Sequence, residues 1–144
     1  MSLLTGLCEP TKLLAFAQPP DQKTTTDILN RIREDLHPGQ RQFVDDQSTE
    51  IIGVSAGYGA GKTRALCAKA VFMAAANQGF TGCVMEPTGP LIRDIWQTDF
   101  DNFLEEYEIP YTFRASPLPE YILHLEKDTK LLCRSFENWQ RIIG

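Results

Sequence analysis

Apolar positions at helical spacing mark the first predicted element of the chain. Ile28, Ile32 and Leu36 form one stripe, which predicts a short helix with a packing face. Thr26 or Asp27 is expected to cap this helix, because short polar side chains accept hydrogen bonds from the first free N–H groups. The helix is therefore expected to pack against other elements through its apolar stripe.

Short apolar runs and longer helical patterns alternate through the middle of the chain. Residues 50–55, EIIGVS, predict a buried strand, and residues 62–78 predict a helix that ends at Gly79. Residues 81–87 predict a second buried strand, and residues 90–107 predict a second helix. Strands and helices in alternation are typical of an α/β fold.

The second helix and the segment that follows it complete the predicted architecture. The apolar stripe of this helix is formed by Ile92, Ile95, Trp96, Phe103, Leu104 and Tyr107. Residues 121–135 contain two apolar runs joined at residues 126–129, EKDT, which predicts a hairpin. The chain is thus expected to form a parallel sheet with flanking helices and an added hairpin.

Composition limits the size and the location of the protein. The 144 residues, 42% of them hydrophobic, can bury one core, so one domain or part of one is expected. The net charge of −5 gives no general attraction to nucleic acid, so any DNA contact must come from local arginines or from parts outside this chain. No apolar run is long enough to span a membrane, and an intracellular, soluble protein is expected. The scattered cysteines form neither a zinc nor a disulfide pattern: Cys8, Cys67, Cys83 and Cys133.

A glycine-rich segment separates the first predicted strand from the helix at 62–78. It follows the spacing A-x-x-x-x-G-K-T, with Ala56 in place of the usual first glycine. Glycines let backbone N–H groups turn inward and the helix N-terminus adds its dipole, so the segment is expected to bind phosphate. Lys62 would reach the β and γ phosphates, and the Thr63 hydroxyl would hold Mg²⁺. The predicted nucleotide-binding residues of this loop are Ala56, Gly57, Tyr58, Gly59, Ala60, Gly61, Lys62 and Thr63.

A second candidate element precedes the loop. Leu36, Pro38 and Gln40 form the pattern L-x-P-x-Q. The amide of Gln40 can both donate to and accept from an adenine edge, which would favour adenine over guanine. A Pro-Gly turn with a solvated glutamine is the alternative interpretation.

Together these segments resemble the large terminase subunits of tailed bacteriophages, the ATP-driven motors that package DNA into procapsids. The matching segments are LHPGQRQFV, IIGVSAGYGAGKT, CVMEPTGPLIRDIWQTDFDNFL and YILHLEKDTKLLCRSFENWQRIIG. The resemblance implies an incomplete P-loop NTPase fold of the RecA-like (ASCE) type, with residues 1–35 as a lead-in and residues 36–144 as the N-terminal portion of the ATPase domain. It further implies ATP and Mg²⁺ as cofactors.

The resemblance also implies partners and a location. Terminase motors act on double-stranded DNA with a portal protein and a small terminase subunit, and can form a homo-oligomeric ring on the portal. The expected location is the host cytoplasm. The Walker A loop and the glutamine are shared with superfamily one helicases, whereas the EPTGPLIRDIWQTDFDNFL segment, the hairpin and CRSFEN favour a terminase.

One departure from the family pattern concerns the γ phosphate. Family loops commonly carry an arginine with a charge-sensing role where this chain has Tyr58, for which an aromatic lid or a surface side chain is expected. An arginine finger must then come from elsewhere. The candidates are Arg64, Arg93 and Arg134, and a surface or ion-pairing role is the alternative for each.

The second departure concerns hydrolysis, which needs an apolar strand ending in Asp-Glu to hold Mg²⁺ and activate water. No such strand occurs: residues 43–46, FVDD, precede the loop, and Phe136 and Glu137 stand where the acidic pair is needed. The chain alone is therefore predicted to be inactive, either as the N-terminal part of a longer hydrolase or as a naturally short protein. Two other classes remain open, a superfamily one or two helicase fragment and a nucleotide-binding or assembly protein that does not hydrolyse ATP.

Overall fold

The computed structural model describes residues 24–137, so most of the predicted lead-in, residues 1–35, lies outside the described residues. The helices are α1 (Thr25–Asp35), α2 (Pro38–Asp45), α3 (Lys62–Ala76), α4 (Gly89–Leu91), the π-helix η1 (Ile92–Gln97) and α5 (Thr98–Glu106). The strands are β1 (Thr81–Glu86), β2 (Tyr111–Arg114), β3 (Glu120–His124) and β4 (Asp128–Ser135). The predicted α/β class is confirmed. None of the helices in this range is long and apolar enough to cross a membrane.

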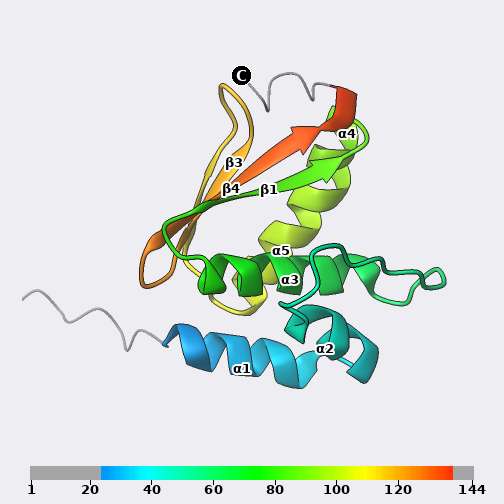
Figure 1. Cartoon of the computed structure of the whole chain (residues 1–144). Coiled ribbons are helices and arrows are strands. Elements are labelled where there is room, and N and C mark those ends of the chain that lie inside the picture. The colour runs from blue at the N-terminus through cyan, green and yellow to red at the C-terminus, as the bar shows by residue number, and fades with distance from the viewer. Residues whose placement is uncertain (1–23, 138–144) are drawn as a thin grey trace, which may run out of the picture.

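Within the described range, four strands form one mixed sheet in the order β1-β4-β3-β2 (Figure 1). β1 and β4 run parallel, with Thr81 opposite Lys130, whereas β3 is antiparallel to both β4 and β2. The hairpin predicted over residues 121–135 is therefore confirmed as β3 and β4. β2 was not predicted, because four residues are too few to show a clear alternation of apolar and polar positions.

The strand predicted at residues 50–55 is wrong. The structure assigns no strand there, and the side chains of Ile51 and Val54 are 88% and 48% exposed. A strand is held by hydrogen bonds to a neighbour, and no strand between residues 24 and 137 pairs with this segment. Hydrophobic character alone therefore does not make it part of the sheet.

The first predicted helix is confirmed as α1, with a different cap. Thr24 is the N-cap and accepts from the backbone N–H of Asp27 at 3.2 Å, so the prediction of Thr26 or Asp27 as the cap is wrong. Asp27 instead lies at the third helical position, where its carboxylate accepts from the Thr24 N–H and closes a capping box. The stripe of α1 is buried as predicted: Ile28, Ile32 and Leu36.

The second long helix is confirmed over residues 89–106, but its middle section is a π-helix, η1. A π turn holds more residues than an α turn, so it rotates the stripe relative to regular α-helical spacing. Ile95, predicted to lie on the stripe, is therefore 47% exposed, while Phe100, which the prediction omitted, is fully buried. Trp96 is fully buried, as predicted.

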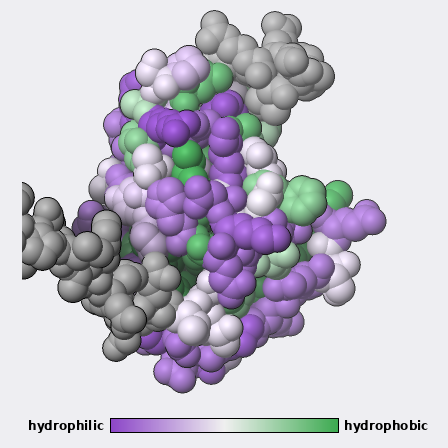
Figure 2. Space-filling view, turned by 90° about the vertical axis from the view of Figure 1, so that its left-hand side faces the viewer, coloured by the Kyte–Doolittle hydropathy of each residue, from purple (hydrophilic) through white to green (hydrophobic). Residues whose placement is uncertain are grey.

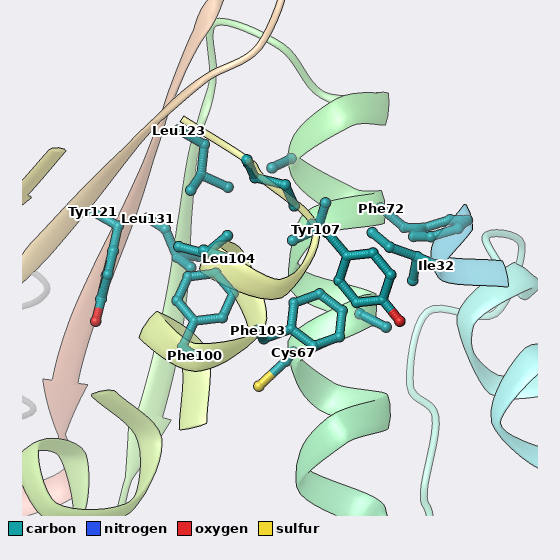
Figure 3. Packing of buried hydrophobic residues seen from close by; sticks show 14 of the residues in the cluster. Ile32, Cys67, Phe72, Phe100, Phe103, Leu104, Tyr107, Tyr121, Leu123 and Leu131 are labelled. Carbon is teal, nitrogen blue, oxygen red and sulfur yellow. The ribbon is translucent and has the colours of Figure 1, made fainter. Parts of the chain in front are cut away.

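The core fills the space between the sheet and α3, and Figure 1 places α3 between the sheet and the pair of α1 and α2. Trp96 stacks on Phe100 with ring centroids 4.8 Å apart, and Phe100 meets Tyr121 of β3 edge to face at 5.0 Å. On the other side of α3, Phe72 and Ile32 extend the cluster toward α1 (Figure 3). The contacts of Trp96 and Phe100 join the helix formed by η1 and α5 to the sheet.

β1 lies at the edge of the sheet and is less buried than the sequence predicts. Val84 is the one buried residue of β1, and the first three residues of the strand are exposed. An open groove of about 480 Å³ runs beside β1 and α3, with Met73 and Phe80 among its lining residues. On the face shown in Figure 2, hydrophilic residues cover most of the surface, and hydrophobic residues show in a central strip and in smaller patches near the top and right of the view.

Candidate functional site

The predicted phosphate loop leads directly into the N-terminus of α3 (Figure 1). Gly59 and Gly61 have positive φ values of 75° and 72°, a left-handed conformation that glycine adopts without a steric penalty. Gly61 is the N-cap of α3, and its carbonyl accepts the first helical hydrogen bond from Ala65 at 3.0 Å. The glycine spacing seen in the sequence therefore corresponds to real turns in the backbone.

The three glycines of the loop meet different surroundings. A Cβ atom at Gly57 or Gly59 would have no neighbour within 4 Å. A Cβ at Gly61 would come within 2.6 Å of the Gln40 side-chain nitrogen. Gly61 is thus required both by its φ value and by the close approach of another side chain.

Lys62 folds back over the loop that precedes it. Its ammonium donates to the carbonyl of Ala56 at 2.9 Å and to that of Gly57 at 2.7 Å. The side chain is exposed, so the charge lies at the surface of the loop and is accessible to a ligand. The structure thus brings the carbonyls of Ala56 and Gly57 together around the Lys62 ammonium.

The N-terminus of α3 lacks the features that usually stabilise a helix start. It has no side-chain cap and no acidic residue in its first turn. Lys62 and Arg64 lie there instead, at the positive end of the helix dipole. α1 shows the opposite arrangement, with Thr24 as a side-chain cap and Asp27 in the first turn. A bound anion would therefore stabilise the start of α3.

Thr63 follows Lys62 in the first turn of α3 and is partly buried. Among the described residues, no group of three or more His, Cys, Asp or Glu could hold a metal ion by itself. A metal at this loop would need ligands from the bound molecule as well as from the Thr63 hydroxyl.

Gln40, the candidate adenine contact, is 7% exposed and lies in α2, so it is not the solvated turn residue of the alternative interpretation. Its amide oxygen accepts from the His37 N–H at 3.1 Å, and its amide nitrogen donates to the Gly61 carbonyl at 2.9 Å. Both polar atoms of the side chain therefore already have protein partners, one of them in the phosphate loop.

His37 is a residue that the sequence reasoning missed at this site. It is the N-cap of α2, and its Nδ1 accepts from the backbone N–H of Gln40 at 3.3 Å. Its Nε2 lies 3.4 Å from the Ala60 carbonyl. The signal for it was present, because His-Pro-x-Gln places a capping side chain, a first-position Pro38 and a third-position glutamine in capping-box order.

Tyr58 points into solvent, with a fully exposed side chain. It therefore does not form an aromatic lid over the loop, and the surface interpretation matches its position. Two of the candidate arginines, Arg93 and Arg134, line a pocket to which no loop residue contributes. Arg134 donates to the carbonyls of Pro119 and Cys133 at 2.9 Å, and Arg93 is exposed beside it, with both residues lining a small pocket of about 150 Å³.

Arg64, in the first turn of α3, forms an ion pair with Glu106 of α5. Its guanidinium donates two hydrogen bonds to Glu106, each 2.8 Å long, and one to the Tyr107 hydroxyl at 2.6 Å. The hydrogen bonds from Arg64 lower the pKa of Glu106. The Tyr107 hydroxyl in turn donates to Asp35 of α1 at 2.9 Å. Arg64 therefore connects α3, α5 and α1.

We expect Arg64→Met to lower the free energy of unfolding by about 1–2 kcal/mol, because it removes charged hydrogen bonds from a partly exposed site. Arg93→Met is the matched control, since Arg93 is exposed and has no hydrogen-bond partner among the described residues. Urea unfolding followed by circular dichroism measures both variants. Equal stabilities for the two variants would contradict the structural role of Arg64.

Three of the four cysteines lie within the described residues. Cys67, Cys83 and Cys133 are free, and Cys8 lies outside the described residues. Burial raises the pKa of the Cys67 and Cys133 thiols to about 12. These two thiols are therefore packing groups and not nucleophiles at neutral pH.

Comparison of the chain with family models, curated proteins and solved structures found no match. The assignment of a function therefore depends on the residues and on the geometry described above.

Proposed function

We propose that this chain binds the phosphates of Mg-ATP through the loop formed by residues 56–63. The observation that supports the proposal is the start of α3, where glycine turns, an uncapped helix N-terminus and Lys62 occur together. Lys62 now donates to two loop carbonyls, and phosphate oxygens would be stronger acceptors for the same ammonium. The N–H groups of the first turn would supply the remaining donors.

Mg²⁺ would be shared between the ligand and the protein in this proposal. The Thr63 hydroxyl would contribute one oxygen, and phosphate oxygens and water would supply the others, as is usual for Mg²⁺ at nucleotide sites. The metal would neutralise phosphate charge next to the loop. No step of hydrolysis is assigned to the described residues.

We further propose that the loop belongs to the N-terminal portion of a terminase-like P-loop NTPase, a motor that translocates double-stranded DNA. The support is the order of the segments: the glutamine element, the loop, β1 followed by Pro-Thr, the long helix, and the hairpin whose second strand ends in Arg-Ser. The portal protein, the small subunit and a homo-oligomeric ring are partners that follow from this proposal. Their contacts would involve surfaces beyond the loop.

A nucleotide-binding protein that does not hydrolyse ATP is the second candidate. One observation favours it: the sequence after the loop contains no apolar strand that ends in Asp-Glu. Hydrolysis of a nucleoside triphosphate requires an acidic residue for Mg²⁺ and a group that orients water. Binding without turnover is therefore the activity expected of this chain alone.

Calorimetric titration of the chain with ATP in the presence of Mg²⁺ tests the proposal. Saturable binding is expected, with weaker binding after Mg²⁺ is removed with a chelator, because the metal offsets phosphate charge. Phosphate release should stay at the background rate. The absence of binding heat at several temperatures, with the chain folded by circular dichroism, would overturn the proposal.

A further inference from the structure

The side chains of His37 and Gln40 connect α2 to the last part of the phosphate loop. We call these two side chains the α2 clasp. Gln40 reaches the Gly61 carbonyl and His37 reaches the Ala60 carbonyl, so consecutive loop residues are held by the same helix end. None of residues 50–59, which precede Ala60 and Gly61, is buried. The clasp is therefore a defined connection between the body of the fold and an otherwise exposed loop.

The hydrogen bonds of the clasp are satisfied by one neutral form of the histidine. Because the backbone N–H of Gln40 donates to Nδ1, the ring proton must lie on Nε2. That proton faces the Ala60 carbonyl at 3.4 Å. The same ring thus caps α2 with one nitrogen and contacts the loop with the other.

Gln40 completes the clasp from a buried position. Its oxygen faces the His37 N–H and its nitrogen faces the Gly61 carbonyl, so the amide is fixed at both ends. Gly61 accepts from Gln40 and from Ala65 at once, which fixes the orientation of the peptide unit that enters α3. The peptide N–H of Lys62 belongs to this unit and is one of the donors that a phosphate would use.

We propose that the α2 clasp positions the phosphate loop, and that it increases nucleotide affinity through the phosphates and independently of the base. This inference rests on the proposed function, because it assigns a role at the same loop. In it, His37 and Gln40 are positioning residues: they act through Ala60 and Gly61 and do not touch the ligand. Beyond these two hydrogen bonds the Gln40 amide keeps one N–H and one oxygen lone pair, and its 7% exposure leaves them little access to an adenine ring.

The clasp offers matched substitutions that separate capping from loop contact. In His37→Asn the side-chain oxygen can replace Nδ1 as the cap acceptor but is too short to reach Ala60. In His37→Gln the amide nitrogen can replace the Nε2 donor, while the cap acceptor is lost. Gln40→Met keeps the length of the side chain and removes both hydrogen bonds.

The test measures Kd by calorimetry for Mg-ATP, Mg-GTP and Mg-tripolyphosphate, together with Tm for each variant. Gln40→Met is expected to weaken all three ligands by the same factor, about tenfold, the equivalent of one or two hydrogen bonds. His37→Asn should weaken all three by about threefold while keeping the wild-type Tm, and His37→Gln should keep affinity and lower Tm.

Each outcome supports or overturns a defined statement. If Gln40→Met lost affinity for Mg-ATP alone, the statement that the clasp acts independently of the base would be overturned, and an adenine contact would be identified. The positioning role of His37 would be overturned if His37→Asn bound the ligands with wild-type affinity. It would also be overturned if both histidine variants lost affinity and Tm to the same extent. If the wild-type chain binds none of the three ligands, the proposed function itself fails, and that result is distinct from either of the others.

Discussion

Lys62→Ala is expected to remove detectable binding of Mg-ATP. The ammonium of Lys62 lies over the loop, held by the carbonyls of Ala56 and Gly57, where a β or γ phosphate would meet it. Two charged hydrogen bonds to phosphate are together worth about 3 kcal/mol or more, so the Kd should rise at least about 100-fold. Calorimetric titration of the variant with Mg-ATP measures the loss.

The control for this variant is Lys130→Ala, which removes the same charge from β4. Lys130 pairs with Glu120 at 3.8 Å and lies on the sheet, not on the loop. Its replacement should leave the Kd within about twofold of the wild type, because exposed charges at a distance are screened by salt. Similar losses of affinity in the two variants would indicate a general electrostatic effect and not a specific contact at the loop. Unchanged affinity in Lys62→Ala would remove the basis for the phosphate site.

Trp96→Ala is expected to cause the largest loss of stability, about 3–5 kcal/mol of unfolding free energy. Trp96 is fully buried in η1 and stacks on Phe100, which in turn meets Tyr121 of the sheet. The substitution leaves a cavity between the long helix and the sheet. Since a domain of this size is stable by only about 5–15 kcal/mol, a large share of its stability would be lost. Urea unfolding followed by circular dichroism gives the difference.

Trp96→Phe is the companion variant, because it keeps an aromatic ring for the contact with Phe100. It should cost clearly less than the alanine variant, about 1–2 kcal/mol. If both variants unfold at the same urea concentration as the wild type, then the aromatic cluster does not hold the helix to the sheet.

Local patterns in the sequence were enough to predict the elements that have local causes. α1, α3 and the hairpin of β3 and β4 follow from periodicity within each segment. The turns at Gly59 and Gly61 could be predicted from the glycine spacing, because glycine adopts a left-handed backbone without a steric penalty. Lys62 lies over this loop, and its binding of phosphate stays a prediction.

Features that depend on the rest of the fold were missed. The apolar run at residues 50–55 resembles a strand, but strand formation requires a pairing partner that the run itself does not encode. The exposure of Ile95 follows from the π-helix, since a change of helical phase is invisible to a pattern with fixed spacing. The capping role of His37 has a local signal in the sequence, whereas its contact with Ala60 joins residues that are distant in the sequence.

The three glycines of the loop formed by residues 56–63 look alike in the sequence, yet they should differ in how readily other residues can replace them. Position 57 is open to many side chains, because neither space nor a left-handed backbone restricts it. Position 59 has space but a φ of 75°, so asparagine is its most acceptable replacement. Gly61 is restricted by both its φ of 72° and the Gln40 side chain, which makes it the glycine that evolution can replace least easily.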